Sequence, residues 1–211
     1  MAIRTIRVDE DEILRKISKP VKDITPRTDE LIDDMIETLH IANGVGLAAV
    51  QVGVLKRICI VSIEPADLLP AEDEEAEAED GAVAEEDASE DNASSEETEE
   101  EEFILDEDFD LTHTGGEDIV IINPTIVVLD DETQTGNEGC LSVPNKYGMV
   151  TRPNHILLKA YDRNLEPFEL EAKGLLARAI CHECDHMDGI LYTDKLEGEL
   201  YEYAQPEEET E

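Results

Sequence analysis

The sequence predicts an α+β fold in which a C-terminal helix packs on a mostly antiparallel sheet. Two observations indicate this class. Apolar residues recur at helical spacing in the N-terminal and C-terminal parts of the chain, and short apolar runs punctuated by prolines occupy the region between them. The chain has 211 residues, 40% of them hydrophobic, which is enough for one well-buried core. We therefore expect a single domain over residues 1–211.

Two helices are predicted in the N-terminal part. Residues 11–18 are a short candidate, and a longer helix follows Thr28, whose side chain can cap its first turn. Asn43 and Gly44 suit the end of this helix, because glycine tolerates the left-handed conformation that terminates helices. Residues 44–53 are too rich in glycine and alanine to predict a good strand or helix. The apolar face of the longer helix consists of Leu31, Ile32, Met35, Ile36 and Leu39.

The rest of the ordered chain is predicted to hold short strands and one more helix. Residues 58–63 predict a buried strand, and residues 174–187 predict the C-terminal helix. Pro124, Pro144 and Pro153 suit strand edges or turns. The remaining strand candidates are residues 119–122, 125–129, 156–161 and 168–170.

The negative charge is concentrated in one segment. Residues 64–118 contain 26 of the 55 acidic residues and no lysine or arginine, so the rest of the chain carries 29 acids against 16 bases. The net charge of -39 is therefore mostly local. A tract of Ala, Glu, Asp and Ser cannot bury enough apolar surface to fold alone. We expect a disordered insertion, with Phe103 to Leu111 as its one apolar patch, that does not cover the functional site.

Neither a secretory signal nor a membrane span is predicted. The first ten residues lack the apolar region of a signal peptide. The longest apolar run, residues 44–55, is shorter than the roughly 20 residues that a helix needs to cross a membrane. We therefore expect a cytoplasmic protein, in which four cysteines indicate reduced thiols or metal ligands rather than disulfides.

Residues 182–186 have the H-E-x-x-H pattern of a metal site. On a helix, His182 and His186 lie about 40° apart, so both can bind one metal ion from the same face. Glu183 lies beside them, close enough to contact a metal-bound water without being a ligand. The pattern sits in an otherwise apolar helix, which favours a metal site over two solvated histidines.

Two histidines leave the metal one protein ligand short of a usual catalytic site. Tyr192 occupies the position where one class of zinc peptidases has its third histidine. Spacing alone leaves two sources open. Glu197 or Glu199 could act from downstream, and Cys140 could act from upstream.

Three segments of the chain together resemble the peptide deformylase family. They are residues 44–51 (GVGLAAVQ), 138–142 (EGCLS) and 182–186 (HECDH), and they occur in the family's order. The resemblance covers the chain apart from the acidic insertion and about the last ten residues. It implies a deformylase-like catalytic domain.

The resemblance also implies a ligand set and a base. Cys140, His182 and His186 would bind one divalent metal, Fe²⁺ in this family, with Zn²⁺, Ni²⁺ or Co²⁺ as substitutes. Glu183 would accept the proton of the attacking water and pass it to the leaving amine. The substrate would be the N-terminal formyl-methionine of nascent proteins, and formate would be released.

The remaining roles implied by the resemblance concern the substrate. The Gln51 side chain and the Leu141 backbone N–H would hold the developing oxyanion. Glu138 has an alternative structural role, as the partner of Arg152. The expected substrate-binding residues are Gly44, Val45, Gly46, Glu138 and Gly139.

The C-terminal end departs from some members of that family. They carry a basic helix that contacts the ribosome, whereas no lysine or arginine follows Lys195 here. An acidic tail is repelled by RNA. We expect neither direct nucleic-acid binding nor ribosome docking by that route.

Two other functions remain as alternatives. One is a zinc endopeptidase, which would keep its metal without Cys140. The other is an acidic interaction protein with a purely structural metal, for which Glu183 would have no use. Helical geometry directs Cys181 and Cys184 away from the two histidines, so we expect them to be buried small hydrophobic residues.

Overall fold

The computed structural model describes residues 2–63 and 118–203. The predictions for the acidic insertion, including Phe103 to Leu111, fall on residues 64–117 and lie outside the described part. Asp118, which was predicted to be the last residue of the insertion, is instead the first residue of a strand. In chain order the elements, with 3-10 helices written η, are η1 (Glu12–Arg15), α1 (Pro26–Ile41), β1 (Gly46–Ala48), η2 (Ala49–Val52), β2 (Ile58–Ser62), β3 (Asp118–Val128), β4 (Thr133–Cys140), β5 (Val143–Pro153), β6 (His155–Tyr161), β7 (Pro167–Lys173), α2 (Gly174–Met187), η5 (Tyr192–Asp194) and β8 (Tyr201–Glu202).

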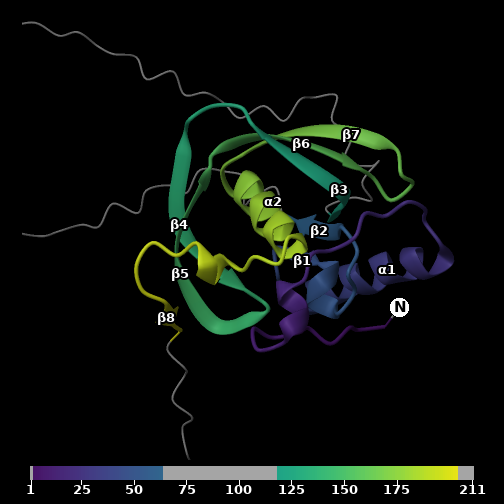
Figure 1. The fold of residues 1–211 in the computed structure, drawn as a ribbon, viewed down its shortest axis with the longest axis horizontal. Helices are drawn as coiled ribbons and strands as arrows, with labels where there is room; N and C mark the ends of the chain where they lie inside the picture. The colour runs from purple at the N-terminus through teal and green to yellow at the C-terminus, as the bar shows by residue number, and fades with distance from the viewer. Residues whose placement is uncertain (1, 64–117, 204–211) are drawn as a thin grey trace, which may run out of the picture. The chain divides into compact units, whose positions relative to one another are not determined.

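The strands form two antiparallel sheets with α2 between them (Figure 1). The larger sheet has the order β1-β2-β3-β6-β7, and the smaller one has the order β4-β5-β8. Helix α2 contacts β1, β2 and β7 of the larger sheet and β5 of the smaller one. This arrangement confirms the predicted α+β class, and the predicted bounds of the C-terminal helix are those of α2.

Helix α1 begins earlier than predicted. Thr25, not Thr28, caps it: the Thr25 hydroxyl accepts a hydrogen bond from the Thr28 backbone N–H, and Pro26 occupies the first turn. Proline suits that position because its fixed φ is already helical and it has no N–H to leave unpaired. At the other end Asn43, with φ of 49°, takes the left-handed conformation. The apolar face packs on the larger sheet, as expected.

The strand predictions were right for β2, β3, β6 and β7, although β6 and β7 are buried on one face only, and they missed β4, β5 and β8. Strand β2 is buried as predicted. The two predicted strands on either side of Asn123 are one strand, β3, whose pairing with β6 is irregular between Ile122 and Thr125. The glycine-rich segment does form a short strand and a turn of 3-10 helix, β1 and η2. The hairpin β4–β5 was missed because Thr133–Cys140 carries no apolar alternation.

The hairpin β4–β5 positions one candidate ligand. Its register is regular from Thr133 to Gly139 and shifts between Gly139 and Cys140. Such an irregularity re-aims the side chain that follows it. Cys140 is therefore brought to the end of the strand on the side where α2 packs, while Val143 and Val150 of β5 join a small buried cluster with Leu14, Leu191 and Tyr192.

His155 of β6 provides a test of how the larger sheet responds to pH. Partial burial opposes its charge, but hydrogen bonds to Glu171 on β7 and to Asp130 outweigh burial and raise the pKa of His155 above its usual value. A raised folded-state pKa stabilises the fold below the unfolded pKa of about 6.5, and this stabilisation is lost as pH rises through the folded value. His155→Gln should therefore lower the free energy of unfolding more at about pH 6 than at about pH 9.

Urea unfolding at the two pH values measures this difference. Lys159→Gln is the matched control, because Lys159 pairs with Glu169 across the same two strands. Its effect should be similar at both pH values. An equal loss at both pH values for His155→Gln would contradict the assignment.

Candidate metal centre and catalytic pocket

Cys140, His182 and His186 bring one donor atom each to the same point. The three donor atoms lie within 4.8 Å of one another, and the Cys140 Sγ is 3.2 Å from the His186 Nε2. The histidines are one turn apart on α2, as their spacing predicted, and the cysteine comes from the end of β4. Glu197 and Glu199, the downstream alternatives, are not part of this group.

Glu138 fixes the orientation of His182. The His182 Nδ1 is 2.9 Å from the Glu138 Oε2, and both groups are buried. A carboxylate on Nδ1 favours the tautomer that leaves Nε2 free to bind a metal. The same carboxylate accepts two hydrogen bonds from Arg152, from Nε and Nη2, each 2.9 Å long. Arg178 of α2 adds a third arginine hydrogen bond of 2.9 Å from its Nη1.

These contacts explain why a carboxylate is tolerated in the interior. Burial opposes the charge of Glu138, yet hydrogen bonds from Arg152 and His182 hold its pKa well below the usual value. The expected pairing of Glu138 with Arg152 is present. Glu138 lines the pocket, but Arg152, Arg178 and His182 occupy its oxygens, so its contact with a substrate remains a prediction.

The donor set fits a divalent cation. Burial and the neighbouring His182 hold the pKa of His186 well below its usual value, so this imidazole is neutral, as a ligand must be. Burial opposes a charge on His182, but hydrogen bonds with Cys140 and Glu138 raise its pKa to about 10. The surroundings that favour a proton on His182 also favour a metal cation at this position, and a bound metal would displace that proton.

Glu183 lies in the same cavity with one carboxylate oxygen unused. It is buried, and its Oε2 has no hydrogen-bond partner among the described residues. Burial raises the pKa of Glu183 to about 7. A carboxyl group with a pKa near neutrality can both accept and return a proton. Gly46 of β1 packs directly against it, because a Cβ at Gly46 would lie only 2.7 Å from the Glu183 Cδ.

Gln51 and Leu141 provide hydrogen-bond donors next to Cys140. The Gln51 Oε1 accepts from the Ala48 backbone N–H at 2.7 Å, which fixes the amide so that Nε2 faces Cys140 (3.5 Å) and Ser142 (3.1 Å). The Leu141 backbone N–H has no acceptor within the part of the chain that the structure describes. Both groups can donate to an oxygen bound beside the three donor atoms.

A cavity of about 620 Å³ joins these groups. Every residue predicted for the site lines it except His186, which is buried behind Cys140. The structure therefore collects in one pocket residues from β1, η2, β4 and α2 that are far apart in the sequence. The predicted residues that line it are Gly44, Val45, Gly46, Gln51, Glu138, Gly139, Cys140, Leu141, His182 and Glu183.

Sequence reasoning missed four residues around this pocket. Ser142 accepts from Gln51, Arg178 binds Glu138, Tyr192 lies over the His182 ring at 6.1 Å, and Tyr203 lines the cavity. One signal was visible for Arg178. It is the one charged residue in the otherwise apolar first two turns of the predicted helix, residues 174–181, and a buried arginine needs an acidic partner.

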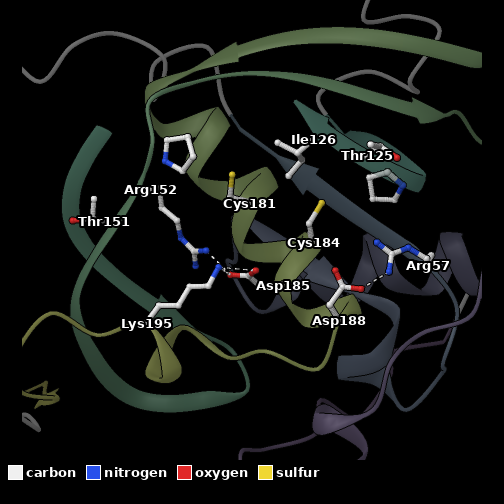
Figure 2. Close-up of a pocket in the computed structure, with 12 residues that line it drawn as sticks. Arg57, Thr125, Ile126, Thr151, Arg152, Cys181, Cys184, Asp185, Asp188 and Lys195 are labelled. Carbon is white, nitrogen blue, oxygen red and sulfur yellow. Dashed lines mark hydrogen bonds and ion pairs between the residues drawn. The ribbon is translucent and has the colours of Figure 1, made fainter. Parts of the chain in front are cut away.

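The other face of α2 borders a second cavity, of about 500 Å³ (Figure 2). Cys181 and Cys184 line it, on the side of the helix away from the ligand triad, as their helical positions predicted. Both are free thiols, and burial raises the pKa of Cys181 to about 11. They are buried small residues, as expected, and ion pairs of Arg57 with Asp188 and of Arg152 with Asp185 border the cavity.

Fold and site together define a class of protein. A cysteine and two histidines converge on one point, and a buried carboxylate with an unused oxygen lies in the same cavity. The Gln51 amide and the Leu141 backbone N–H lie next to the cysteine. This arrangement fits a hydrolase that uses one metal ion, because it combines three side chains that could hold the ion, a carboxylate that could accept a proton and two hydrogen-bond donors.

Comparison with known proteins gives the family. The chain matches the model of the family described as polypeptide deformylase over residues 3–200. It is 44% identical to a peptide deformylase of Lachnoclostridium phytofermentans over 211 residues, which is 100% of this chain and 99% of that protein. It is 40% identical to a peptide deformylase of Agathobacter rectalis over 202 residues, 96% of this chain and 95% of that protein. The chain belongs to this family of metal-dependent hydrolases, which remove the N-terminal formyl group.

Solved structures agree with the fold. A peptide deformylase from Legionella pneumophila is 35% identical, with a TM-score of 0.65 and coverage of 93% of this chain and 87% of that one. The peptide deformylase of Ehrlichia chaffeensis in complex with actinonin is 29% identical, with a TM-score of 0.68 and coverage of 93% and 90%. These likenesses extend over nearly the whole of each chain.

The Glu138 contacts predict an effect on metal affinity. Glu138→Gln should weaken Zn²⁺ binding by roughly ten- to a hundredfold, because the His182 ring loses the carboxylate that orients it. Competition with a chromophoric chelator measures this, with circular dichroism as a check on folding. Asp185→Asn is the control, since Asp185 also binds Arg152, whereas the His182 Nδ1 is bound by Glu138 and not by Asp185. Equal affinity of Glu138→Gln and wild type would contradict the role.

The contact of Gly46 with Glu183 predicts an effect on turnover. Gly46→Ala should displace Glu183 and lower kcat on the order of a hundredfold, the usual cost of a misplaced catalytic group, with metal content unchanged. Formate release and metal analysis measure the two quantities. In a Glu183→Gln background the same substitution should cost little more, because the two residues act through one contact. Full additivity would show that Gly46 acts elsewhere.

Proposed function

We propose that Cys140, His182 and His186 hold one Fe²⁺ ion and that Glu183 is the catalytic base for removal of the formyl group from formyl-methionyl peptides. The observation that carries the assignment of the base is the buried Glu183 Oε2, which has no partner among the described residues and lies in the same cavity as the ligand triad. The choice of iron comes from the family resemblance alone, because one thiolate and two imidazoles also suit zinc, nickel and cobalt.

The chemistry divides between the metal and the chain. When bound, a divalent metal supplies Lewis-acid activation of a water molecule and of the formyl oxygen. Glu183 accepts the proton that the water loses as its oxygen bonds to the formyl carbon. The carbon–nitrogen bond then breaks, and Glu183 returns the proton to the methionine nitrogen, so that water and formamide become formate and a free amine. Gln51 and Leu141 donate hydrogen bonds to the oxygen on which negative charge develops.

The peptide is proposed to bind in extended form between two strand edges. β1 is the edge strand of the larger sheet, and β4 is the edge strand of the smaller one. Gly44, Val45 and Gly46 line one side of the pocket, and Gly139 lines the other. Free backbone groups on a strand edge bind a peptide as an added strand, largely independently of its sequence. That mode suits an enzyme whose substrates share only their first residue.

Location and partners follow from the substrate. No helix among the described residues is long and apolar enough to cross a membrane. We propose that the chain works in the cytoplasm, where nascent proteins are made, as a single catalytic domain with an acidic insertion. We also propose that it neither binds nucleic acid nor docks on the ribosome through a basic helix. In support, no lysine or arginine follows Lys195, and the described residues near that end form β8.

Anaerobic turnover of formyl-Met-Ala-Ser by the iron-loaded protein tests the proposal. Wild type should release formate. Glu183→Gln, shown to be metal-replete, should lose roughly a hundred- to ten-thousandfold in kcat, the usual contribution of a positioned base. Formate release by a metal-replete Glu183→Gln variant at the wild-type rate would exclude Glu183 as the base.

A second variant separates the rival endopeptidase. Cys140→Ala should lose the metal, whereas an endopeptidase with a downstream ligand would retain it. Metal analysis of the folded variant decides between the two, and cleavage of casein by wild type would favour the endopeptidase.

A further inference from the structure

The C-terminal strand carries an aromatic group to the mouth of the catalytic pocket. β8 pairs with β5, with Tyr201 opposite Tyr147, and the Tyr203 backbone N–H donates to the Asn145 carbonyl at 3.0 Å. The Tyr147 ring contacts both other tyrosines, with centroids 5.6 Å from Tyr201 and 4.6 Å from Tyr203. The three rings form one cluster, Tyr147, Tyr201 and Tyr203, on the smaller sheet.

Only one member of this cluster reaches the pocket. Tyr203 lines the cavity that holds the ligand triad, whereas Tyr147 and Tyr201 do not. Its hydroxyl lies beside Gly139, since a Cβ at Gly139 would be 3.7 Å from it. Tyr203 is 58% exposed, so packing of the free protein accounts for less than half of its surface. An exposed aromatic ring on a pocket wall is available to a ligand.

The position of Tyr203 relative to the metal site indicates which part of a substrate it would meet. Gly139 immediately precedes the candidate ligand Cys140, and Tyr203 lies over Gly139 on the wall formed by β4 and β5. A peptide whose formyl group lies at the ligand triad extends away from it by about 3.3 Å per residue. The side chains beyond methionine are therefore the ones within reach of this wall.

We propose that Tyr203 is a specificity-determining residue that favours peptides with a large apolar or aromatic side chain after the formyl-methionine. This inference rests on the deformylase activity proposed above. An aromatic face gains most from burial against another ring or a large apolar group. Lys146, which lines the same wall, repels basic side chains and so disfavours the cation–π alternative.

The test compares selectivity and not activity alone. The peptides formyl-Met-Ala-Phe and formyl-Met-Phe-Ser are each compared with formyl-Met-Ala-Ser, as ratios of kcat/KM. Tyr203→Ala should lower at least one ratio by roughly three- to tenfold, the range that one aromatic contact is worth. The loss should appear in KM, because binding of a remote side chain is the same in ground and transition states.

Two further variants make the test specific. Tyr203→Phe keeps the ring and should keep both ratios. Tyr201→Ala removes a ring from the same cluster and strand without touching the pocket, so it too should keep them.

Several outcomes would overturn the proposal. Unchanged ratios in Tyr203→Ala exclude a contact with the substrate, and an equal loss in Tyr201→Ala assigns the effect to the strand as a whole. A loss in Tyr203→Phe as large as in Tyr203→Ala would assign it to the hydroxyl. Absence of formate from every peptide with metal-loaded wild type would overturn the deformylase activity itself, and the role of Tyr203 with it.

Discussion

The buried carboxylate of Glu138 is the interaction on which the site depends. It stands on β4, accepts hydrogen bonds from Arg152 on β5 and Arg178 on α2, and holds the His182 ring. One partner removed from such a buried group costs several kcal/mol, on the order of 3–5, because it leaves an uncompensated charge. The contacts therefore tie the smaller sheet to α2, and this connection is what brings Cys140 to the two histidines.

Helix α2 serves the site on one face and the core on the other. Its ligand face meets β4, while Glu183 packs against Gly46 on β1 so closely that no side chain fits there. Cys181 and Cys184, on the face turned away from the triad, are protonated buried thiols and leave Cys140 as the one cysteine placed for metal binding. This tight contact is a second reason for glycine at position 46, which the sequence analysis had assigned to substrate binding alone.

Chemistry and selectivity occupy different parts of the pocket. The groups proposed to act on the formyl unit come from η2, the end of β4 and α2, where packing and hydrogen bonds hold them in place. The outer wall is formed by β4, the start of β5 and Tyr203, which is 58% exposed. We therefore expect a change at Tyr203 to alter which peptides bind more than it disturbs the donor atoms, because the Tyr203 hydroxyl lies beside Gly139 and not against the ligand triad.

The sequence alone determined local features, namely the position of a helix and the residues that share one of its faces. The spacing of His182 and His186 predicts one helical face because the helix period is fixed, and the bounds of α2 followed from the same pattern. The pairing of strands far apart in the sequence could not be predicted. Thr133–Cys140 has no apolar alternation, so β4 was missed, and Arg178 was missed as a partner of Glu138, although Arg152 was expected. Spacing likewise left Cys140, Glu197 and Glu199 open as the third ligand. Only the tertiary structure shows which of them lies near the histidines, because β4 packs beside α2 and carries Cys140, not either glutamate, to within 3.2 Å of His186.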